Sequence, residues 1–87
     1  MFIIFINTIF VLKSQYIVIM EEFGEKIKER RKSLSITQRE LASLAGVGIN
    51  TLTKIERGEA NPSLKVIFSI LATLGLKMDI SINSNKF

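Results

Sequence analysis

The 87-residue chain contains no cysteine and no histidine, and it has only one proline. Without cysteine it can form neither disulfides nor thiolate metal sites, and without histidine it has no imidazole base. An enzyme would have to work with carboxylates, lysine, serine and threonine alone. The sequence shows no carboxylate pair beside a nucleophile, no phosphate-binding glycine loop and no metal-ligand spacing. We therefore expect a protein that is not an enzyme and that uses no cofactor or metal.

Positive charge is concentrated in the middle of the chain. The net charge is +4, from 12 Lys and Arg against 8 Asp and Glu. Residues 26–57 alone hold eight basic and three acidic residues, a net charge of +5. A basic balance of this kind favours a nucleic acid or an anionic surface as partner. The length allows one small domain, which dimerisation would help to stabilise.

Residues 1–19 form an apolar leader that differs from the rest of the chain. Lys13 is the single charge among residues 1–20. The apolar run Met1–Leu12 is shorter than the ~20 residues that span a bilayer, and it lacks the marks of a secretory signal. Three interpretations stay open. The leader is untranslated A/T-rich DNA that was read as protein, and the true start is Met20; or it is a β-strand that includes the β-prone segment Tyr16–Met20; or it is a membrane anchor.

Four helices are expected in residues 20–75, at Glu21–Lys32, Gln38–Ala45, Ile49–Arg57 and Leu64–Leu74. Apolar residues recur at helical spacing within each range. The residues expected to face inward are Phe23, Ile27 and Arg31 in the first helix, Leu41, Leu44 and Ala45 in the second, Leu52 and Ile55 in the third, and Leu64, Ile67, Phe68, Leu71 and Leu74 in the fourth.

Local sequence marks the ends of these helices. Thr37 and Glu40 have the spacing of a capping box, and Ser63 is placed to cap the fourth helix. Gly46 follows the second helix and Gly75 the fourth, where a glycine can take the positive φ of a helix stop. These signs define two short helices joined by a glycine-containing turn, a helix-turn-helix unit over residues 38–57.

Residues 76–87 are expected to form a dimerisation strand and a tail. Leu76, Met78, Ile80 and Ile82 alternate with polar residues, the period of a half-buried β-strand. A lone strand needs a partner. Pairing with its own copy across a two-fold axis would give a homodimer, and the alternative is packing against a leader strand within one chain.

The stretch Phe23–Leu76 resembles the phage-repressor-like (Xre-type, Cro/cI-like) helix-turn-helix family. The resemblance lies in Ile36–Ala42, Ala45–Val47, Thr51–Gly58 and Asn61–Leu64. It implies a mainly α, lambda-repressor-like bundle of four helices, here followed by a C-terminal β-strand. It also implies a sequence-specific repressor of double-stranded DNA. The chain departs from the usual pattern with Ser35 in place of glycine and Gly48 in place of serine or threonine.

The predicted strand also makes the chain similar to HipB-type antitoxins. That resemblance implies strand pairing in the dimer and a HipA-type kinase toxin as partner. Three functions therefore stay open. The first is a cytoplasmic repressor that binds a palindromic operator, including its own promoter. The second is an antitoxin whose main role is to neutralise a toxin. The third is a membrane-associated regulator that uses the leader.

The family resemblance assigns the DNA contacts to the second and third helices. The implied set is Gln38, Gly48, Ile49, Asn50, Thr51, Thr53 and Lys54. Gln38 would contact a phosphate, or else be an exposed residue of the capping turn. Asn50 and Lys54 can read adenine and guanine, and Ile49 can contact a thymine methyl group. Thr51 and Thr53 can donate to phosphates. The alternative is that this face of the third helix contacts only solvent.

Arg31 and Glu56 are expected to play a structural role. Both lie on helix faces that point partly inward, and family members carry an ion pair at the equivalent positions. We therefore expect a salt bridge between Arg31 and Glu56 that ties the first helix to the third.

Overall fold

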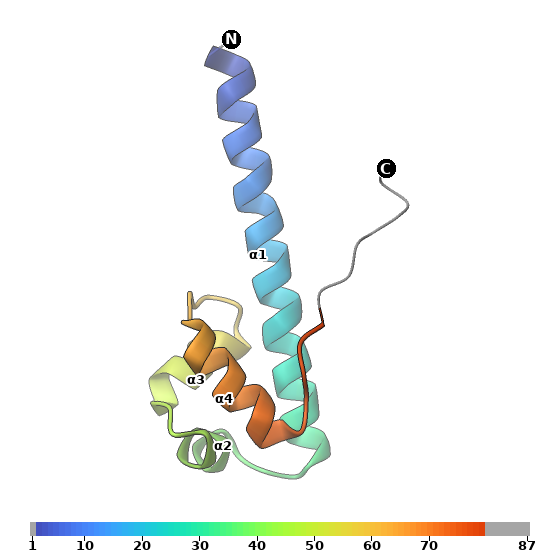
Figure 1. The fold of residues 1–87 in the computed structure, drawn as a ribbon, viewed down its shortest axis with the longest axis vertical. Coiled ribbons are helices and arrows are strands. Elements are labelled where there is room, and N and C mark those ends of the chain that lie inside the picture. Colours follow the sequence, from blue (N-terminus) through green and yellow to red (C-terminus); the bar gives the residue numbers. More distant parts are fainter. Residues whose placement is uncertain (1, 80–87) are drawn as a thin grey trace.

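The computed structural model of the chain describes residues 2–79 and contains four helices (Figure 1). They are α1 (Phe2–Ser33), α2 (Gln38–Ala45), α3 (Ile49–Glu56) and α4 (Leu64–Leu74). The three short helices pack around the C-terminal half of α1, and the N-terminal half projects beyond them (Figure 1). The fold is mainly α, as expected. Within the described range, none of the helices combines the length and the apolarity needed to cross a bilayer.

The leader is helical, so the expectation of a leader strand is wrong. Helix α1 begins at Phe2 rather than at Glu21 and runs without a break to Ser33. Each residue added to a helix that has already nucleated gains a hydrogen bond at a small entropic cost. Extension of the charged helix that follows therefore overrides the β-propensity of the isoleucine, valine and phenylalanine residues.

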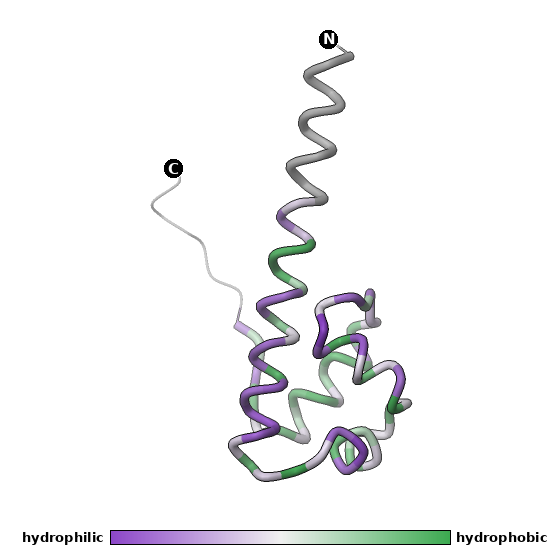
Figure 2. Tube along the Cα trace, turned by 180° about the vertical axis from the view of Figure 1, so that it is seen from behind, coloured by the Kyte–Doolittle hydropathy of each residue, from purple (hydrophilic) through white to green (hydrophobic). Residues whose placement is uncertain are grey.

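The core is built from all four helices. Its largest fully buried side chains are Ile27, Leu41, Leu52, Ile55, Ile70 and Leu74. Burying an aliphatic side chain of this size contributes roughly 1.5–3 kcal/mol. The buried cluster contains residues of α1, α2, α3 and α4, and Figure 2 shows apolar colour on α3 and α4 where they lie beside α1. The core therefore fixes α3, the helix expected to read DNA, from behind.

Three residues that were expected to face inward are exposed instead. Leu44 on α2 and Leu64 and Phe68 on α4 lie on the surface, whereas Ile70 is fully buried. The contact side of α4 is the row through Ile70 and Leu74, and α4 carries apolar residues on both sides of that row. Helical spacing identifies the broad apolar arc, but the packing against α2 selects which part of it is buried.

The helix ends form as the local sequence predicts. The Thr37 hydroxyl accepts from the Glu40 N–H at 3.0 Å, and the Thr37 N–H donates to Glu40 Oε1 at 3.0 Å. Ser63 Oγ accepts from the Val66 N–H at 3.3 Å. Helices α2 and α4 end at Gly46 and Gly75, which have φ of 69° and 70°. Helix α3 ends one residue early, at Glu56.

The C-terminal strand that was expected at residues 76–82 is not found in the described part. Residues 76–79 have no strand hydrogen bonds, and the Leu76 N–H instead donates to Leu71 O at 2.8 Å as part of the helix stop. A strand requires a neighbouring strand, and none lies beside these residues. Leu76 is half-buried and Met78 is exposed. Ile80 and Ile82 lie outside the described residues.

Helix α1 approaches the end of α3 very closely. A Cβ atom on Gly24 would lie 2.2 Å from Ile55 O, and one on Gly58 would lie 2.9 Å from Glu21 Cα. One turn earlier on α1, Met20 is buried. The Tyr16 hydroxyl, further along the helix, donates to Asn61 Oδ1 at 2.9 Å. Part of the leader therefore packs against the segment that follows α3.

Candidate nucleic-acid interface

A tight three-residue turn joins α2 to α3. Gly46 adopts the left-handed conformation, and the Val47 N–H donates to Ala42 O at 3.0 Å. Val47 is half-buried against the core, so the turn is anchored from inside. Gly48 follows in an extended conformation as the N-cap of α3 and has no side chain with which to cap it. These contacts fix the direction in which α3 leaves the turn.

Helix α3 has a buried side and an exposed side. Leu52 and Ile55 are fully buried, and the predicted base-reading residues Asn50 and Lys54 are exposed together with Thr51. The exposed side thus presents an amide, a hydroxyl and an ammonium group, which can donate to or accept from DNA. An α-helix with its side chains is about 10–12 Å across, so it fits the ~12 Å width of the major groove of B-form DNA.

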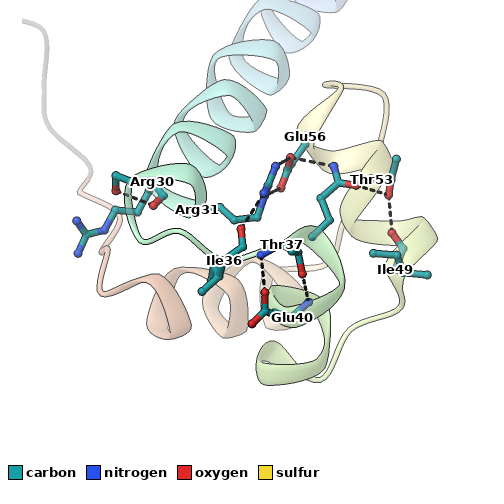
Figure 3. A network of polar contacts seen from close by, with 10 residues as sticks. Arg30, Arg31, Ile36, Thr37, Glu40, Ile49, Thr53 and Glu56 are labelled. Atoms are coloured by element: carbon teal, nitrogen blue, oxygen red, sulfur yellow. Dashed lines mark hydrogen bonds and ion pairs between the residues drawn. The ribbon is translucent and has the colours of Figure 1, made fainter.

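Ile49 and Thr53 lie between these two sides and are half-buried. Ile49 packs against the edge of the core. The Thr53 hydroxyl donates to Ile49 O at 2.8 Å and also lies 3.4 Å from Gln38 Oε1 (Figure 3). Both residues therefore have structural contacts of their own beside the exposed face.

Gln38 connects the start of α2 to α3. Its Nε2 donates to Glu56 Oε1 at 3.0 Å, and its Oε1 faces the Thr53 hydroxyl. The side chain is half-buried rather than fully solvated. The sequence predicts a phosphate contact for Gln38 but not this internal link, because the bond to Glu56 depends on how α2 packs against α3.

The predicted ion pair between Arg31 and Glu56 is confirmed (Figure 3). Arg31 Nε donates to Glu56 Oε2 at 2.7 Å, and Nη2 donates to Oε1 at 3.0 Å. Arg31 Nη1 also donates to Ile36 O at 2.9 Å. The two residues are only 8% and 7% exposed, and no buried side-chain polar atom in the described residues lacks a partner. This two-pronged contact joins α1, the segment before α2, and α3.

Gly24 is a further residue that sequence analysis did not single out. Its missing side chain lets the backbone of α1 contact the carbonyl groups of Ile55 and Glu56. Glycine inside a helix is unfavourable for stability. Its presence at position 24, among strong helix formers, is therefore a sequence signal for a close contact between two helices. Together with the ion pair, this contact holds the C-terminal end of α3 against α1.

Comparison with known proteins places these features in context. The sequence model of a family described as helix-turn-helix matches residues 27–80. An uncharacterized HTH-type transcriptional regulator from Archaeoglobus fulgidus is 39% identical over 54 residues, 62% of this chain and 76% of that protein. A similar regulator from Methanocaldococcus jannaschii is also 39% identical over 54 residues, 62% of this chain and 82% of that protein.

Two further relatives have more specific names. The immunity repressor protein of Bacillus phage phi105 is 36% identical over 55 residues, which are 63% of this chain and 38% of the repressor. The crystal structure of the restriction-modification controller protein C.AhdI from Aeromonas hydrophila is similar with a TM-score of 0.66 and 28% identity. The alignment covers 69% of this chain and 91% of that protein.

Proposed function

The chain belongs to the Xre-type helix-turn-helix family, and on that basis we propose that it is a sequence-specific repressor that binds a double-stranded DNA operator as a homodimer. The family consists of DNA-binding transcriptional regulators, in agreement with the expectation that the chain is not an enzyme. The proposal adds the mode of action, the operator symmetry and the residues that read the bases. We propose that the protein is located in the cytoplasm and acts there on DNA.

The observation that carries this proposal is the arrangement of α3. Its inner side is held by Leu52, Ile55 and the buried carboxylate of Glu56, and Asn50, Thr51 and Lys54 face outward. A helix fixed in this way can enter the major groove without a change in its own packing. Binding then costs little conformational entropy in the protein.

The exposed side chains divide into two kinds of contact. Asn50 can accept from and donate to one adenine edge, and Lys54 can donate to guanine. We propose that Gln38, Thr51 and Thr53 contact phosphates, and that Ile49 and Gly48 lie closest to the groove. Phosphate contacts fix the position of the protein on the duplex, whereas the base contacts select the sequence.

A two-fold dimer would place two copies of α3 about one turn of DNA apart, ~34 Å, and would bind a palindrome. Occupation of such a site over a promoter excludes RNA polymerase. We propose the region upstream of this gene as the first operator to test.

The test is fluorescence anisotropy of the full chain with a labelled duplex from upstream of its gene and with a scrambled duplex. We expect tighter binding to the upstream duplex and affinity that falls with salt on both duplexes. Asn50→Ala should remove most of the difference between the two duplexes. Ser43→Ala, at an exposed position on α2, should leave that difference intact. Equal binding to both duplexes by the unmodified chain would refute recognition of this operator.

The antitoxin interpretation receives no comparable support. It rested on a paired strand at Leu76–Ile82, and residues 76–79 are not a strand. We therefore do not carry the HipA-type toxin into the proposed function.

A further inference from the structure

We propose that Arg57, at the C-terminal end of α3, contacts a DNA phosphate, and that its guanidinium group gives up the carboxylate of Glu59 to do so. The family resemblance does not imply a contact for Arg57. The contact rests on the proposed function, because it requires α3 to lie in the major groove. It adds a residue that determines affinity rather than sequence preference.

Arg57 continues the row of exposed residues along α3. Asn50, Lys54 and Arg57 are all exposed, and they follow one another at steps of four and three residues. Successive residues of an α-helix turn by about 100°, so these three side chains lie within an arc of roughly 60°. Arg57 is the C-cap of α3 and keeps helical backbone angles, with φ of −86° and ψ of −3°. The face that is proposed to read DNA therefore ends in an arginine.

The backbone that carries Arg57 is fixed by the helix stop that follows it. The Gly58 N–H donates to Ile55 O at 3.0 Å. The Glu59 N–H donates to Lys54 O at 3.0 Å. With Gly58 at φ of 74°, these two bonds form a Schellman motif, and Gly58 also packs closely against α1. Arg57 therefore starts from a fixed point, and its side chain can move without a change in the fold.

The ion pair that Arg57 makes within the chain is loose and exposed. Arg57 Nε lies 3.7 Å from Glu59 Oε2, and the two side chains are 58% and 59% exposed. This distance is longer than a hydrogen bond, and exposed pairs of this kind contribute little to stability. A phosphate can accept two short, charge-assisted hydrogen bonds from one guanidinium group. Exchange of the carboxylate for a phosphate is therefore favourable for Arg57.

The position of Arg57 along α3 favours a phosphate over a base. In helix-turn-helix proteins the N-terminal residues of the second helix contact the base edges. Arg57 lies seven residues beyond Asn50, about 10.5 Å further along the helix axis. At that end the side chain reaches the phosphates that border the groove rather than the bases at its floor.

Electrostatics also call for a cation at this end of α3. The C-terminal end of a helix carries a partial negative charge of about half an elementary charge. Glu59 adds a full negative charge close to it. Both would repel a phosphate if Arg57 were absent. The alternative is that Arg57 only stabilises α3 through the same helix dipole, without touching DNA.

The test measures how DNA binding by the full chain depends on salt, on both the upstream and the scrambled duplex. Arg57→Gln should weaken binding to both duplexes by the same factor, since phosphates carry no sequence information. One lost phosphate contact lowers the slope of log affinity against log salt by about 0.9, so the fall in affinity between about 50 and 200 mM salt should become about 3.5-fold smaller for each bound copy. Arg57→Lys keeps the charge and should keep the slope.

Lys77→Gln is the matched control. It removes the same charge from an exposed position, but residues 76–79 run along a different side of α1 from α3 (Figure 1). Its effect on the slope should be much smaller. Equal changes of slope in Arg57→Gln and Lys77→Gln would overturn the contact. A lower midpoint of thermal unfolding in Arg57→Gln with an unchanged slope would overturn it as well, and would assign Arg57 to the stability of α3.

The exchange of anions is tested at Glu59. Glu59→Gln removes the competing carboxylate, so affinity for both duplexes should rise roughly twofold to fivefold, the range expected for an exposed ion pair. Unchanged or weaker binding by Glu59→Gln would overturn the exchange.

The proposed function and the Arg57 contact fail in different ways. No binding of the unmodified chain to either duplex at low salt would refute both. Binding with a salt slope that Arg57→Gln leaves unchanged would refute the Arg57 contact and leave the proposed function standing. A lowered slope in a chain that does not distinguish the two duplexes would support the contact and count against recognition of this operator.

Discussion

Arg31 and Glu56 meet in a buried, two-pronged ion pair, with Arg31 Nε 2.7 Å from Glu56 Oε2. The pair joins α1 to the end of the helix that is expected to read DNA. Its position behind α3 gives it a structural role, and Gln38 extends it to the start of α2. The stability of the DNA-reading unit therefore depends on keeping both charges together.

Arg31→Met should destabilise the fold by roughly 3 kcal/mol, because it leaves a buried carboxylate without its cation. Urea denaturation followed by circular dichroism measures this loss. The double variant Arg31→Met with Glu56→Leu removes both charges and should regain a large part of it. A double variant whose loss equals the sum of the two single losses would show that the side chains are not coupled.

Gly24→Ala should be destabilising although alanine is normally the better helix residue. The new Cβ would lie 2.2 Å from Ile55 O, so α1 and α3 must separate. We expect a loss of roughly 2–3 kcal/mol in the same denaturation experiment. Gly46→Ala is the comparison, because nothing lies within 4 Å of its Cβ and only the positive φ is penalised, by about 1 kcal/mol. A stabilising Gly24→Ala would contradict the close contact.

Ser35→Gly should stabilise the protein by about 0.5–1 kcal/mol. Ser35 has φ of 59° at the end of α1, a conformation that costs little only for glycine. It is also a position at which the sequence departs from the glycine that the family resemblance implies. Ser43→Gly, in the interior of α2, should instead lower stability by a few tenths of a kcal/mol. The midpoints of thermal unfolding should therefore move in opposite directions.

The capping box at the start of α2 should make stability depend on pH in the acid range. Hydrogen bonds from the Thr37 N–H and hydroxyl lower the pKa of Glu40 below its ordinary value. Because the folded pKa is the lower one, this contribution is complete above the unfolded pKa and is lost as pH falls through the folded pKa. Glu40→Gln should flatten this part of the curve of unfolding free energy against pH. An unchanged slope would exclude Glu40 as its source.

Sequence predicted those parts of the molecule that local contacts determine. The bounds of α2 and α4, the capping box at Thr37 and the glycine stops depend on residues within about six positions of one another. The strand expected after Gly75 depends on a partner strand, and residues 76–79 do not form a strand. The inner side of α4 depends on packing, and it was predicted only in part: Leu71 and Leu74 are buried, whereas Leu64 and Phe68 are exposed. The Gln38–Glu56 bond was missed for the same reason. The buried ion pair was predicted because the family resemblance supplied the distant partner.

Gln38→Ala separates the internal role of this residue from its predicted phosphate contact. The variant should fold, because Glu56 keeps both bonds from Arg31. If Gln38 contacts a phosphate in the complex, affinity should fall by the same factor on the upstream and the scrambled duplex, since phosphates carry no sequence information. Asn50→Ala should instead lose mainly the difference between the two duplexes. Unchanged affinity of Gln38→Ala on both duplexes would restrict Gln38 to bracing α3 through Glu56 and Thr53.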